Sequence, residues 1–93
     1  DLAYAINNYG NVLSQQGRDE EALRIAEDAL EKHPEHPALL AARGDALLVT
    51  GQYARAAADY ETAIRTLLRR EHGHERVADL FPDHTQSRVV GRR

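Results

Sequence analysis

The sequence predicts an all-α protein built from antiparallel helix-turn-helix units, and three observations lead to that prediction. Alanine, leucine, glutamate and arginine are abundant, whereas aromatic residues make up only 5% of the 93 residues, a composition that favours helices over strands. The chain resembles itself when it is shifted by 34 residues. Glycine and proline recur at the places where helices of such units would end or begin.

The 34-residue shift aligns small and large apolar residues with one another. Six pairs are identical when residues 1–34 are compared with residues 35–68: Gly10 with Gly44, Leu13 with Leu47, Gly17 with Gly51, Ala22 with Ala56, Glu27 with Glu61, and Ala29 with Ala63. Most of these pairs fall where two packed helices need small or apolar residues. Internal similarity at this period is typical of helical repeat proteins, so we expect two repeats, residues 3–36 and 37–70.

The first repeat is expected to be two helices with a turn at Gly17. Ile6, Tyr9, Gly10 and Leu13 recur at helical spacing and form the packed face of the first helix. The acidic run at residues 19–21 suits the first turn of the second helix, because the helix dipole favours negative charge there. That helix carries an apolar face of Ala22, Ile25, Ala26, Ala29 and Leu30, and it ends before Pro34.

The second repeat has the same plan. Pro37 suits the first turn of its first helix, whose packed face holds Leu40, Gly44 and Leu47, and Gly51 ends that helix. The next helix is lined by Ala56, Tyr60, Ala63, Ile64 and Leu67. Because Leu68 replaces the proline found in the first repeat, we expect this helix to continue to about residues 70–72.

A short capping helix is expected at residues 74–81. Val77, Leu80 and Phe81 have the spacing to cover the apolar side of the preceding helix. Residues 1–81 are therefore predicted to form a single domain, and the polar residues 82–93 a flexible tail. The chain has no methionine, so we also expect it to be a piece of a longer protein.

The net charge, the cysteine content and the length of apolar runs exclude several classes of protein. The net charge is −3, with 12 basic and 15 acidic residues mixed along the chain, and no basic block indicates nucleic-acid binding. Cysteine is absent, which excludes disulfides and thiolate metal sites. No apolar run approaches the length of a membrane span and no signal peptide opens the chain, so we expect a cytoplasmic protein that does not bind membranes.

Catalytic and metal-binding patterns are missing. The run His-Gly-His-Glu at 72–75 lacks the second histidine of the zinc-protease helix, because Ala78 stands in its place. The glycines do not form a phosphate-binding loop, and no nucleophile elbow is present. We therefore expect no enzyme activity within the chain, no cofactor and no metal.

The repeat resembles the tetratricopeptide repeat over residues 3–70. The first copy supplies the family's characteristic residues with Ile6, Tyr9, Gly10, Leu13, Ala22, Ala26, Ala29 and Pro34, and the second with Leu40, Arg43, Gly44, Leu47, Ala56, Tyr60, Ala63 and Leu68. Ala26, Arg43 and Leu68 depart from the family pattern. The resemblance implies that the helix pairs stack into a short right-handed α-solenoid. A family variant with arginine and aspartate at two of its positions implies that Arg43 pairs with Asp59 as a structural contact.

The resemblance also implies a peptide-binding groove on the concave face. Carried over from the family, that face holds Tyr4, Asn7, Asn11, Ser14 and Gln15 in the first repeat and Ala38, Ala41, Asp45, Leu48 and Val49 in the second. Family members that bind chaperone tails hold a terminal carboxylate with a five-residue clamp. Asn11 and Arg76 match that clamp, but Asn7, Ala42 and His72 replace its other residues, so the full clamp is absent.

The expected function is a non-catalytic protein-interaction module, or scaffold, that binds a peptide or partner protein. One alternative is a structural or oligomerisation element, because two repeats expose apolar ends through which weak self-association can occur. The other is an accessory segment of a larger enzyme whose catalytic domain is outside these residues. A fold alone does not decide among the three.

Overall fold

The computed structural model describes residues 1–72, and these residues form two antiparallel helix pairs. The helices are α1 (Leu2–Gln15), α2 (Asp19–Lys32), α3 (Pro37–Val49) and α4 (Tyr53–His72). The described part contains no strand. The all-α prediction is therefore confirmed, and each helix lies where the sequence placed it. The predicted capping helix 74–81 and the tail 82–93 lie outside the described residues.

Local signals in the sequence account for the starts of the first three helices. Asp1 caps α1, since its Oδ1 accepts a hydrogen bond of 2.8 Å from the Tyr4 N–H. Three acidic residues occupy the first turn of α2, where the helix dipole stabilises them. Pro37 is the first residue of α3, and the preceding His36 side chain accepts a hydrogen bond from the Ala38 N–H.

The turn within each repeat contains a glycine with a positive φ. Gly17 has a φ of 76° and Gly51 has a φ of 81°, values that disfavour any residue with a Cβ atom. After α1, the Arg18 N–H donates to the Leu13 carbonyl at 2.8 Å and the Gly17 N–H donates to the Ser14 carbonyl at 3.0 Å. The turn after α3 repeats both bonds, so each helix ends in a Schellman motif that satisfies its last carbonyls.

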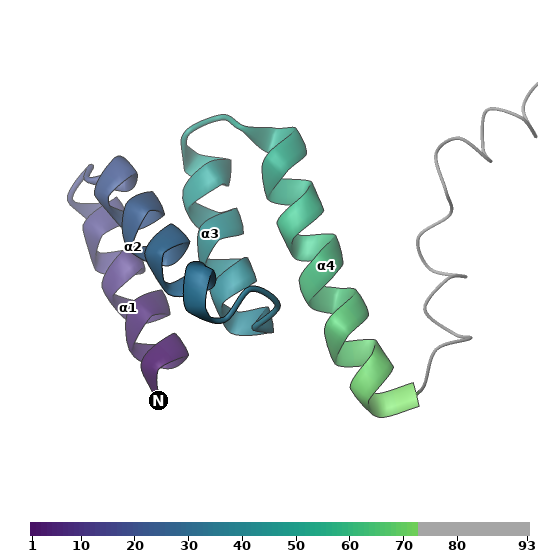
Figure 1. Cartoon of the computed structure of the whole chain (residues 1–93). Coiled ribbons are helices and arrows are strands. Elements are labelled where there is room, and N and C mark those ends of the chain that lie inside the picture. Colours follow the sequence, from purple (N-terminus) through teal and green to yellow (C-terminus); the bar gives the residue numbers. More distant parts are fainter. Residues whose placement is uncertain (73–93) are drawn as a thin grey trace, which may run out of the picture.

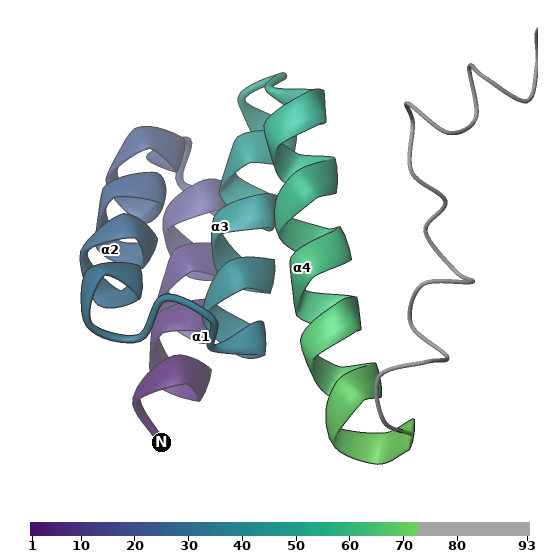
Figure 2. The ribbon, with the colours of Figure 1, turned by 45° about the vertical axis from the view of Figure 1, so that its right-hand side comes forward.

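Helix α3 is the centre of the described fold. It packs against α1 and α2 on one side and against α4 on the other, and α4 extends beyond the start of α3 (Figures 1 and 2). Because α3 has neighbours on two sides, it buries Leu39 as well as the predicted Leu40 and Leu47. Leu39, which the helical spacing did not single out, lies in one cluster with Ala3 of α1 and Leu30 of α2.

One predicted core residue was wrong. Tyr9 was assigned to the packed face of α1, but it is 49% exposed. Its counterpart one repeat later, Arg43, reaches a partner on α4. The described residues place no helix before α1, so Tyr9 has no neighbour on that side. On α4 two polar residues are buried: Asp59, which was predicted as the partner of Arg43, and Thr66, which was not singled out from the sequence.

Candidate functional site

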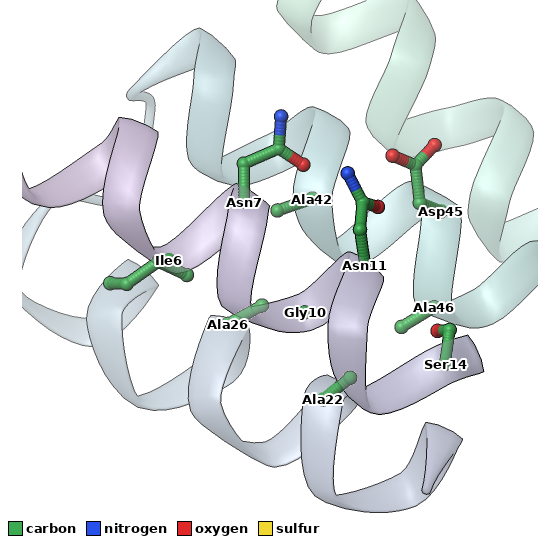
Figure 3. A pocket seen from close by; sticks show the side chains of 10 residues that line it. All are labelled: Ile6, Asn7, Gly10, Asn11, Ser14, Ala22, Ala26, Ala42, Asp45 and Ala46. Carbon is green, nitrogen blue, oxygen red and sulfur yellow. The ribbon is translucent and has the colours of Figure 1, made fainter. Parts of the chain in front are cut away.

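Four of the predicted groove residues surround one small depression between α1 and α3, which we call the polar hollow. Asn7, Asn11 and Ser14 reach it from α1, and Asp45 reaches it from α3. In Figure 3 the side chains of Asn7, Asn11 and Asp45 all project to the same side of the two helices. The remaining lining is apolar and, apart from Ile6, small: Ile6 and Gly10 of α1, Ala22 and Ala26 of α2, and Ala42 and Ala46 of α3.

The polar hollow is too small to enclose a ligand. Its volume is about 10 Å³, close to the least that holds one water molecule. No hydrogen bond to another described residue occupies the side-chain amides of Asn7 and Asn11. Each amide offers both donors and an acceptor, so this surface can hydrogen-bond a chain that lies across it, without enclosing a side chain.

A comparison of the two repeats explains why the hollow forms. In the second repeat the Tyr60 ring of α4 lies against Gly44, and its hydroxyl donates to Asp45 Oδ1 at 2.5 Å. The shift of 34 residues replaces Tyr60 by Ala26 in the first repeat. The first repeat therefore has no ring above its glycine, and Asn11, the counterpart of Asp45, lacks the phenol partner.

The Tyr60–Asp45 contact affects the acidity of the phenol. Burial raises the pKa of Tyr60 above its ordinary value, and the hydrogen bond to Asp45 raises it further. Tyr60 is therefore a neutral donor to a carboxylate throughout the physiological range. The contact holds the Asp45 side chain at the edge of the polar hollow.

The predicted pair of Arg43 and Asp59 is confirmed. The Arg43 Nε donates to Asp59 Oδ2 at 2.7 Å, and Nη2 donates to Oδ1 at 2.8 Å. This bidentate hydrogen bond raises the pKa of Arg43 more than partial burial lowers it. Neither residue lines the polar hollow. The pair joins α3 to α4, as a structural contact should.

The other predicted groove residues do not reach the polar hollow. Tyr4 lies on the first turn of α1, and Leu48 and Val49 lie on the last turn of α3, all with exposed side chains. Gln15, the last residue of α1, is also exposed and outside the lining. Arg76 lies outside the described residues.

A second depression lies between the start of α3 and the second half of α4, and we call it the apolar groove. Its volume is about 520 Å³, within the range of ligand-binding pockets. Tyr60, Ala63, Ile64, Leu67 and Arg70 line it from α4, and Pro37, Ala38 and Ala41 line it from α3 beside His36. An apolar side of α4 was predicted from the sequence, but this groove was not, since its shape depends on how α3 and α4 cross.

Residues 1–72 contain neither a cluster of metal-ligating side chains nor a helix that could span a membrane. These residues contain no group of three histidine, aspartate or glutamate side chains placed to hold a metal ion. None of the described helices has the length and hydropathy that would let it cross a bilayer.

Two family profiles match the chain. The tetratricopeptide repeat profile matches residues 5–46, and a family of unknown function (DUF7411) matches residues 46–91. Comparison with curated proteins and with solved structures gave no match. Tetratricopeptide repeats generally mediate protein–protein interactions and are typically non-catalytic. The matched segment covers most of α1, all of α2 and most of α3, and the four described helices form the expected antiparallel pairs, so residues 5–46 match the tetratricopeptide repeat both in sequence and in helix arrangement.

Proposed function

We propose that this chain is a non-catalytic interaction module that binds an extended peptide, or a peptide segment of a partner protein, across the polar hollow. The observation that carries the proposal is the pair of Asn7 and Asn11, whose amides share one exposed surface without a hydrogen-bond partner among the described residues. Side-chain amides at this spacing suit a peptide backbone, which offers donors and acceptors at regular intervals.

The size of the surface limits the affinity. The hollow encloses about 10 Å³, so the peptide lies on the surface and buries a contact area at the low end for protein interfaces. We expect dissociation constants in the micromolar range or weaker. Leu48 and Val49, exposed at the end of α3, supply apolar contacts for one or two side chains of the peptide.

The test needs a defined ligand, which selection from a random peptide library displayed on phage supplies. The selected peptides are synthesised with a fluorescent label, and their binding to the full chain is measured by anisotropy. Asn11→Asp and Leu48→Asp are compared with wild type after circular dichroism has shown unchanged helicity. We expect each change to weaken binding by about three- to tenfold, as one net hydrogen bond or apolar contact implies.

Asn8→Asp is the matched control. Asn8 is an exposed asparagine on the same helix, but it does not line the hollow. Asn8→Asp introduces the same charge as Asn11→Asp. Because that charge lies outside the hollow, the affinity should stay within about twofold of wild type. Equal affinities for wild type and for the Asn11 and Leu48 variants would show that another surface binds the peptides. A library that returns no binding peptide would contradict the proposal as a whole.

The alternative of an oligomerisation element has its own observation. Tyr9 and Val12 on α1 are about half exposed, as are Ile64 and Leu67 on α4. Apolar surface is therefore exposed on the first and on the last of the four described helices. Molar mass measured by light scattering over a range of concentrations separates the two functions. An interaction module stays monomeric without its peptide, whereas an oligomerisation element becomes heavier as the concentration rises.

A further inference from the structure

The polar hollow contains one charged side chain, and its charge is negative. Asp45 is the only acidic residue in the described lining, which includes no lysine, arginine or histidine. In Figure 3 the carboxylate of Asp45 projects to the same side of the helices as the amides of Asn7 and Asn11. A ligand that lies on the two amides therefore meets a carboxylate at the same surface.

No cation among the described residues pairs with Asp45. Its hydrogen-bond partner there is the hydroxyl of Tyr60, which donates to Oδ1 at 2.5 Å and carries no charge. Arg43, two positions earlier on α3, binds Asp59 of α4 with both of its donors. The Oδ2 atom of Asp45 is therefore left as an acceptor without a partner among residues 1–72.

The spacing of the two asparagines matches the repeat of an extended peptide. Asn7 and Asn11 are four residues apart in α1, which corresponds to about 6 Å along the helix axis. Two residues of an extended chain span about 6.6 Å, so the two amides can hydrogen-bond backbone groups that are two residues apart in one peptide. A side chain of that peptide that points toward α3 reaches Asp45.

We propose that Asp45 makes this surface selective for peptides that carry a lysine or arginine side chain beside the two amides. The inference rests on the proposed function, because it names the class of peptide that the polar hollow takes. The cationic group donates a charge-assisted hydrogen bond to Asp45 Oδ2, while Asn7 and Asn11 bind the peptide backbone. An acidic side chain at the same place of the peptide meets a like charge and is disfavoured.

This selectivity is opposite to that of the carboxylate clamp described by the family resemblance. Asn11 matches one residue of that clamp, but no described cation lines the hollow, and the charge there is that of Asp45. Among the described residues, the surface thus lacks a group that would attract a carboxylate and has one that attracts a cation.

The exposure of Asp45 limits the size of the effect. The side chain is open to water, and an ion pair in water contributes little because solvent and salt screen it. We expect the charge of Asp45 to strengthen binding of a cationic peptide by about three- to fivefold at about 0.1 M salt. The gain should shrink at about 1 M salt, where the Debye length is about 3 Å.

Peptide selection with different forms of the full chain as bait tests the inference. From the phage library, wild type should select peptides with lysine or arginine at one fixed position, and Asp45→Asn should select peptides without that preference. Asparagine keeps an acceptor for the Tyr60 hydroxyl, so this change removes the charge and retains the contact. Asp28→Asn is the control, since Asp28 is an exposed aspartate of α2 outside the hollow, and it should select as wild type does.

A double-mutant cycle between protein and peptide then measures the contact itself. A selected peptide is compared by anisotropy with a variant in which glutamine replaces the fixed lysine or arginine. The replacement should weaken binding to wild type and to Asp28→Asn by about three- to fivefold at about 0.1 M salt, and it should leave binding to Asp45→Asn unchanged. Circular dichroism shows that each chain keeps its helices.

The outcomes separate this inference from the proposed function. Asn11→Ala removes the amide without adding a charge, so a loss of affinity in that variant shows that a peptide binds at the hollow. Such peptides without a preferred cation, or without coupling to Asp45, would overturn the inference and leave the interaction module intact. A cation preference that persists in Asp45→Asn would assign it to another acidic side chain and would also overturn the inference. A library that returns no peptide overturns the proposed function, and the inference with it.

Discussion

The guanidinium of Arg43 in α3 binds both carboxylate oxygens of Asp59 in α4, at 2.7 and 2.8 Å. Asp59 is buried, whereas Arg43 keeps part of its side chain in contact with solvent. This arrangement explains how an arginine stands on the packed side of an amphipathic helix. The aliphatic part of the side chain lies along the helix surface, and its guanidinium donates hydrogen bonds to a carboxylate on the neighbouring helix.

Asp59→Ala should destabilise the protein by about 1.5–3 kcal/mol, because the change removes two charge-assisted hydrogen bonds and leaves Arg43 partly buried without them. The free energy of unfolding is measured by urea denaturation. Asp28→Ala is the control, since Asp28 is an exposed aspartate on α2, and its effect should stay within about 0.5 kcal/mol. Equal stability of the two variants would contradict a structural role for the pair.

Gly44→Ala and Gly10→Ala should have opposite effects although the two glycines are equivalent in the repeats. A Cβ at position 44 would lie 2.8 Å from Tyr60 Cε1, whereas a Cβ at position 10 would lie 3.9 Å from Ala22 Cβ. Gly44→Ala therefore overpacks the ring and should cost about 1 kcal/mol or more. Gly10→Ala should stabilise the helix by about 0.5–1 kcal/mol.

A double-mutant cycle separates the clash with the ring from other effects of Gly44→Ala. In a Tyr60→Ala background the ring is gone, so Gly44→Ala should no longer destabilise the protein. Thermal or urea denaturation of the four chains gives the coupling energy. A coupling near zero would mean that Tyr60 is not the reason for glycine at position 44.

The raised pKa of Tyr60 predicts that the protein loses stability in alkaline solution. Burial and the hydrogen bond to Asp45 raise its folded-state pKa above the unfolded value of 10.0. The unfolded chain therefore releases this proton at lower pH than the folded chain, so the contribution of Tyr60 is complete below about pH 10 and falls as the pH rises further. Urea denaturation at about pH 8 and about pH 11 measures the change.

Tyr60→Phe is the variant for this comparison. It removes the titrating hydroxyl but keeps the ring against Gly44, so it should lose less stability than wild type between the two pH values. It should also remove the tyrosinate absorbance that appears at the highest pH in a spectrophotometric titration. A decline as steep as that of wild type would assign the alkaline effect to other groups.

Gly17→Ala and Gly51→Ala should each destabilise the protein by about 1 kcal/mol. Both glycines have positive φ, and an alanine there pays the cost of the left-handed conformation for a residue with a Cβ. The space around each position is open, so the cost is conformational and not steric. Asparagine tolerates this conformation better than alanine, so Gly51→Asn should recover part of the loss in urea denaturation.

The number and order of the described helices could be predicted from the sequence because their signals are local. A left-handed glycine, a proline at a first turn and a run of acidic residues act within one turn of the chain, and the 34-residue shift repeats them. The Arg43–Asp59 pair was predicted from the family resemblance. The amides of Asn7 and Asn11 were placed on one face because residues four apart in a helix project to the same side.

The tertiary structure decided which of those faces are covered and where depressions form. Leu39 is buried and Tyr9 is half exposed because α3 has neighbours on two sides, whereas α1 has none before it among the described residues. The apolar groove follows from the crossing of α3 and α4, and the polar hollow from a tyrosine in one repeat where the other has an alanine. Helical periodicity shows to which side of its own helix a side chain points. Whether that side chain is buried depends also on a second helix, whose distance and angle are set by packing along the whole contact.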